Sequence, residues 1–130
     1  MKILVDKNSK IVLTKCEDDI VISQDGDKTS IGSDLLFWGI TASNSDIVED
    51  ATLPTSLVSK LYSYDAGTWT ELWETVKAKA KVVKECDDLL DGVPSGTQSQ
   101  WNEYVAAVTA IKDGLMETIN PNLVTYPKKP

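Results

Sequence analysis

The sequence predicts an α+β protein: a small antiparallel β domain over residues 1–70, then a two-helix hairpin with an extended proline-rich tail over residues 71–130. Three observations predict this order. Short β-branched apolar runs separated by turn residues fill the first part. Near residue 71 the apolar residues begin to recur every three or four positions, as they do in a helix. Prolines interrupt the last ten residues, so the tail is not helical.

The first fifty residues contain apolar runs that are too short for helices and recur about every ten residues. Turn residues separate them, and Asp25-Gly26 is the clearest turn, because Asp tolerates and Gly supplies a positive φ. This pattern is typical of a small antiparallel meander, a sandwich or a partly open barrel. The runs are residues 3–5, 11–13, 20–22, 35–40 and 47–48.

A closing hairpin is predicted over residues 62–70. Its aromatic residues, Tyr62, Tyr64 and Trp69, flank a turn at residues 65–67 and would pair across the two strands. Core packing explains them more simply than ligand stacking. A single helical turn is expected just before the hairpin, at residues 55–59.

The first helix is predicted over residues 71–91, where Gly92 and Pro94 end it. Most of its lysines lie off the apolar stripe that we expect to face the core. That stripe consists of Leu72, Val76, Ala80, Val83, Cys86 and Leu90.

The second helix is predicted to begin at Thr97, with Gln100 three residues later completing a capping box. Its apolar stripe follows a near-heptad spacing. Two stripes joined by a short turn predict an antiparallel helical hairpin, or two arms of a multi-chain bundle. The second stripe consists of Trp101, Tyr104, Val108, Ile111, Leu115 and Ile119.

The tail is the strongest candidate for a docking element. Residues 124–126 lie between prolines and suit an added edge strand or a polyproline-like strip in a groove. Ordering such a tail is costly unless something receives it, so we expect it to be unpaired in the free protein, and its removal to leave stability unchanged. A frayed terminus and, for the helix, simple core packing are the alternatives. The predicted partner-binding residues are Trp101, Tyr104, Val108, Ile111, Leu115, Val124, Tyr126, Pro127 and Pro130.

The composition argues against catalysis and against several partner classes. The net charge is −7, all thirteen basic residues are lysine, and His and Arg are absent. Without His there is no Ser–His or Cys–His pair, and no glycine loop for phosphate is present. We therefore predict a non-enzymatic protein without catalytic residues. The acidic balance argues against nucleic acid and an anionic membrane surface as partners, and no apolar run approaches the length of a membrane span.

Metal and cofactor sites are not predicted. The acidic turns at residues 17–19 and 25–27 would hold Ca²⁺ only if they converged, and Ser30 stands where an EF-hand loop needs Gly. Such turns are usually solvated. Cys16 and Cys86 are far apart and form no CxxC pair, which favours two reduced thiols in a protein made and kept inside a cell.

The order Trp101-x-x-Tyr104, helix, Val124-x-Tyr126-Pro127-x-x-Pro130 resembles the C-terminal part of caudoviral tail fibre assembly proteins. The hairpin at residues 64–69 is similar to one that precedes the helices in many phage tail proteins. The resemblance covers about residues 60–130, and Tyr126 stands where the family usually has Trp.

This resemblance implies a bacteriophage tail-associated protein that binds a tail fibre or another tail or baseplate component and aids its assembly. It would act in the host cytoplasm and then leave or remain in the virion tail. The alternative is a structural virion subunit (tail, baseplate or fibre adaptor) that forms a homo-oligomer through its helices. A carbohydrate-binding or hydrolytic module is the contrasting third class.

Overall fold

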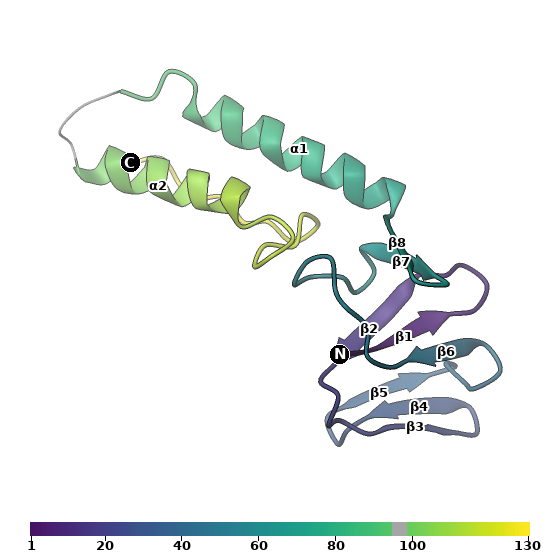
Figure 1. The fold of residues 1–130 in the computed structure, drawn as a ribbon. Coiled ribbons are helices and arrows are strands. Elements are labelled where there is room, and N and C mark those ends of the chain that lie inside the picture. Colours follow the sequence, from purple (N-terminus) through teal and green to yellow (C-terminus); the bar gives the residue numbers. More distant parts are fainter. Residues whose placement is uncertain (95–98) are drawn as a thin grey trace. The chain divides into compact units, whose positions relative to one another are not determined.

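A computed structural model describes residues 1–94 and 99–130. These residues form eight antiparallel strands followed by two packed helices, so the predicted fold class is confirmed (Figure 1). The chain divides into two compact units. The first contains Met1–Pro54 and Val58–Leu72, and the second contains Thr55–Leu57 and Trp73–Pro130.

The first sheet of the first unit has the order β2-β1-β6 and is antiparallel. It is built from β1 (Lys2–Asp6), β2 (Val12–Cys16) and β6 (Ser45–Val48). Ile3 and Leu4 point to opposite faces of β1, yet both are completely buried. The central strand is therefore covered on both sides, which explains why its sequence is an unbroken apolar run.

The second sheet has the order β3-β4-β5 and is also antiparallel. Its strands are β3 (Ile22–Asp25), β4 (Lys28–Ile31) and β5 (Leu35–Trp38). The predicted turn joins β3 to β4, where Gly26 has a φ of 62°. Strand β4 was missed by the apolar pattern, because Ile31 is its one aliphatic residue.

A buried polar cluster links β4 to the neighbouring segments. The Thr29 hydroxyl donates to the carbonyl oxygen of Ile40 at 2.6 Å. The Gln24 side-chain amide donates to Thr29 at 3.2 Å and to the Ser45 hydroxyl at 2.7 Å. Thr29 and Ser45 are buried, so these hydrogen bonds offset the cost of removing the hydroxyl groups from water.

The predicted hairpin is confirmed as β7 (Tyr62–Asp65) paired with β8 (Thr68–Glu71). The Tyr64 and Trp69 rings meet edge to face across the strands, with their centroids 5.0 Å apart. The helical turn expected at residues 55–59 is wrong. The Leu57 N–H instead donates to the Met116 carbonyl at 2.9 Å, so its backbone bonds to a segment distant in sequence.

The second unit contains α1 (Trp73–Leu90) and α2 (Ser99–Asp113), which lie alongside each other (Figure 1). The predicted stripe of α1 is only partly right. Cys86 is buried, but the other buried side chains of α1 are Thr75 and Val82, and Val76 and Val83 are exposed. This helix carries two apolar stripes, and only one of them faces α2.

The second helix ends at Asp113 and does not continue to Ile119 as its stripe suggested. Gly114 begins a tight turn in which the Ile119 N–H donates to its carbonyl at 2.8 Å. A Cβ atom on Gly114 would lie only 2.8 Å from the Thr118 hydroxyl and 2.9 Å from Ile119, so glycine permits the close approach. The predicted Thr97 cap lies outside the described residues.

Candidate functional site

Four of the predicted partner-binding residues lie on α2 and a fifth, Leu115, follows its end; together they help to build the core of the second unit. Tyr104, Val108 and Ile111 are buried together with Val82 and Cys86. Trp101 and Leu115 pack against this cluster, and the Trp101 ring meets Tyr104 edge to face at 5.8 Å. The unit therefore covers these side chains itself, and a binding role for them stays a prediction.

The tail also packs on its own unit, so the expectation of an unpaired tail is wrong. Val124 and Tyr126 contact the helical core. The Tyr126 hydroxyl donates to the Glu85 carboxylate, and burial together with this hydrogen bond raises the pKa of the tyrosine well above its usual value. Two helices alone leave core side chains uncovered, and covering them offsets the entropy cost of ordering the tail.

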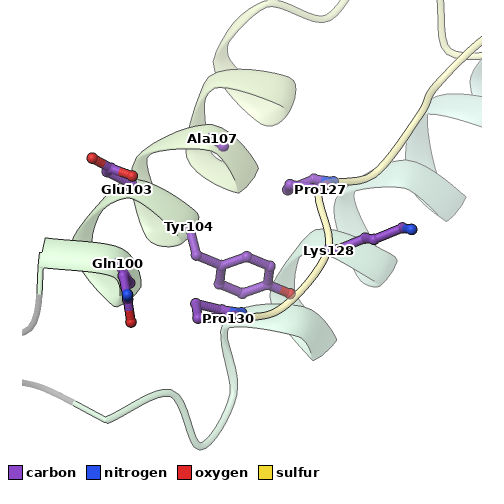
Figure 2. Close-up of a pocket in the computed structure, with 7 residues that line it drawn as sticks. All are labelled: Gln100, Glu103, Tyr104, Ala107, Pro127, Lys128 and Pro130. Carbon is purple, nitrogen blue, oxygen red and sulfur yellow. The ribbon is translucent and has the colours of Figure 1, made fainter.

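The end of the tail runs alongside α2 toward the N-terminal end of this helix, and an open pocket lies between them (Figure 2). The Tyr104 ring points toward Pro130, and its buried hydroxyl has no hydrogen-bond partner within residues 1–94 and 99–130. Among the lining side chains, the charged groups are one carboxylate and one ammonium, which do not form a nucleophile with its base. The lining residues are Gln100, Glu103, Tyr104, Ala107, Pro127, Lys128 and Pro130.

The first unit exposes an apolar strand edge that sequence reasoning missed. Leu35, Leu36 and Trp38 on β5 are all exposed, and β5 is an edge strand of its sheet. The Lys28 ammonium lies 5.5 Å from the Trp38 ring centre, within cation–π range. Edge strands are usually protected by charged residues or proline, and β5 contains neither.

The second unit exposes a comparable set of apolar side chains on α1. Trp73 is 69% exposed, Val76 is 40% exposed and Val83 is 37% exposed. The Lys77 ammonium lies 5.9 Å from the Trp73 ring centre. The sequence does contain a signal for this face, because the apolar residues of α1 form two stripes. Assigning all of them to one stripe conceals the second.

The acidic turns and the cysteines form no reactive cluster in the part of the chain that the structure describes. No group of three metal-ligating side chains lies together there. Asp18 pairs with the N-terminal ammonium at 2.9 Å. Cys16 and Cys86 are free thiols, and burial raises the pKa of each, which disfavours the reactive thiolate. No helix among the described residues is long and apolar enough to cross a bilayer.

Comparison with protein families, curated proteins and solved structures gave no match to this chain. The resemblance to tail fibre assembly proteins therefore depends on the residues quoted for it. The structure places two of these, Trp101 and Tyr104, in edge-to-face contact, and Tyr126 against the same helical core.

Proposed function

We propose that this protein is a non-enzymatic, bacteriophage tail-associated binding protein. It binds a tail fibre or another tail or baseplate component in the host cytoplasm and aids its assembly. The proposal draws on the residue pattern over about residues 60–130. The observation that carries it is that each unit leaves a tryptophan about two-thirds exposed: Trp38 is 67% exposed and Trp73 is 69% exposed.

Exposed tryptophans of this kind are costly unless they are covered. A tryptophan buries roughly 150–250 Å² when it is enclosed, and tryptophan is among the residues most enriched at the energetic centres of protein interfaces. Each tryptophan lies beside a further exposed apolar residue: Leu36 is near Trp38 on β5, and Val76 is near Trp73 on α1. A lysine near each ring contributes roughly 0.5–1 kcal/mol at an exposed site, which does not replace full burial.

The binding surface in this proposal differs from the one expected from sequence. The α2 stripe and the tail hold the second unit together, whereas β5 and the outer face of α1 remain open to a partner. In this proposal the tail stabilises the second unit, and β5 and the outer face of α1 bind the partner.

The second candidate is a structural virion subunit that oligomerises through its helices. One observation favours it: Trp73, Val76, Ala80 and Val83 recur at spacings of three and four residues, as in a coiled-coil seam. Purified virions separate the two candidates. The protein in fixed copy number per tail supports the structural subunit, and its absence from virions supports the assembly role.

The test of the proposal is co-expression with the fibre, tail and baseplate proteins encoded beside it. The expected result is co-purification with one of them, lost in the double variant Trp38→Ala/Trp73→Ala while circular dichroism and melting temperature are kept. Leu123→Ala is the matched control, since Leu123 is an exposed apolar residue outside both surfaces. Failure of every tail protein to co-purify overturns the proposal, as does binding that the double variant retains.

A further inference from the structure

The outer face of α1 has a seam of apolar side chains distinct from the face that packs on α2. Val82 and Cys86 are buried in the core of the unit and Thr75 is also buried, whereas a second set is exposed. The exposed set recurs at the alternating three- and four-residue spacing of the a and d positions of a coiled coil. It consists of Trp73, Val76, Ala80 and Val83.

The seam has a defined length. The next position of the repeat is Asp87, whose carboxylate accepts a hydrogen bond from the Lys112 ammonium on α2. A charge held in this way ends the apolar surface after Val83. The seam therefore spans residues 73–83, about three helical turns or roughly 15 Å, which matches a partner helix of similar length.

The charges that flank the seam are positive on both sides. Lys77 and Lys84 follow the d residues directly, and Lys79 precedes Ala80. These are the e and g positions, where charge selects the partner. The Lys77–Glu74 and Lys84–Asp88 ion pairs lie along α1 itself, and both are exposed, so they are weak and exchange readily with a partner's carboxylates.

A second copy of this chain does not complement these flanks. Pairing α1 with another α1 brings lysine against lysine at the e and g positions in either orientation. A helix with acidic residues beside its apolar stripe satisfies both the seam and its flanks.

We propose, on the basis of the proposed function, that the outer face of α1 binds an amphipathic helix of the partner protein whose apolar stripe is flanked by Glu and Asp. Apolar residues of that helix pack against Trp73, Val76 and Val83, and its carboxylates face Lys77 and Lys84.

The test uses the full-length protein and two synthetic helical peptides of about three heptads with identical Ile and Leu at a and d. One peptide has Glu at every e and g position, and the other has Lys. We expect the acidic peptide to bind about tenfold more tightly or better, by fluorescence anisotropy, and its affinity to fall as salt is raised. Val83→Lys should abolish binding.

Charge reversal makes the test specific. The variant Lys77→Glu/Lys84→Glu should exchange the preference and bind the basic peptide. The control Lys60→Glu/Lys81→Glu changes the net charge equally at exposed lysines off the seam, and should keep the preference for the acidic peptide.

Three results would overturn the inference: equal affinity for the two peptides, no binding of either, or self-association in light scattering that Val83→Lys removes. The last would make a second copy the occupant. Failure here is distinct from failure of the proposed function. If the protein co-purifies with a tail protein but binds neither peptide, only the inference about the α1 partner helix is refuted. If it binds the acidic peptide but co-purifies with no tail protein, only the proposed tail association is refuted.

Discussion

Tyr126 connects the tail to the helices through a hydrogen bond from its hydroxyl and through its partly buried ring. Its hydroxyl donates to Glu85 on α1, and its ring packs against the helical core. The acceptor of this hydrogen bond is a carboxylate, and hydrogen bonds to charged groups are stronger than those between neutral groups. This contact explains why a proline-rich segment, with no helix or strand of its own, lies in one place.

The first prediction concerns this hydroxyl. Tyr126→Phe keeps the ring and removes the bond, so we expect the free energy of unfolding to fall by about 1–2 kcal/mol, measured by urea denaturation. Tyr64→Phe is the control, because Tyr64 is in the other unit. An unchanged stability in Tyr126→Phe would show that the hydroxyl bonds equally well to water.

The same residue predicts a pH dependence. The folded protein raises the pKa of Tyr126, so the neutral form is favoured in the fold. Its contribution is complete below the ordinary tyrosine pKa of about 10 and is lost as the pH rises above it. The wild-type protein should therefore lose more stability than Tyr126→Phe as the pH rises from about 10 to about 12. Parallel curves for the two proteins would contradict this assignment.

At the scale of elements, α1 has two apolar faces with different tasks. The inner face packs on α2 through Val82 and Cys86, and the outer face exposes Val76 and Val83. A helix with one apolar stripe covers it against one neighbour, whereas a second stripe stays exposed unless another surface packs against it. Val82 lies on the inner face, and the next residue, Val83, lies on the outer face.

The second prediction compares these two valines. Val82→Ala removes buried methyl groups and should cost about 2 kcal/mol of unfolding free energy. Val83→Ala is the same chemical change on an exposed face and should cost within about 0.5 kcal/mol. Thermal and urea unfolding of both variants give the values. Equal costs would show that the outer face is buried in solution.

At the scale of the whole molecule, each unit has a core of its own. Ile3, Leu4 and Val12 belong to the first, and Tyr104 and Val108 to the second. Removal of a segment that packs on one core should thus destabilise that unit directly and leave the hydrogen bonds of the other intact.

The third prediction applies this to the tail. Deletion of residues 121–130 should lower the melting temperature of the second unit, because Val124 and Tyr126 cover its core. Amide exchange in β1 and β2 should be unchanged. Deletion of residues 128–130 alone is the control, because these residues are exposed. If deletion of residues 121–130 leaves the melting temperature unchanged, the tail does not stabilise the unit, as the sequence had led us to expect.

The amino-acid sequence is enough to predict the order of the elements: strands first, then an aromatic hairpin, then two helices. These features are local. They follow from the spacing of apolar residues, from turn residues such as Asp25-Gly26, and from β-branched runs such as residues 3–5. Which apolar side chains are covered depends instead on how the helices and the tail pack together. Residues 72–90 contain two apolar stripes that the sequence does not rank. Only the packing of α2 shows that the stripe with Val82 is the buried one. The tail was likewise undecided, because Val124 and Tyr126 suit a foreign groove as well as their own helices. Burial is a property of distant segments meeting in space, and no local pattern encodes which of them meet.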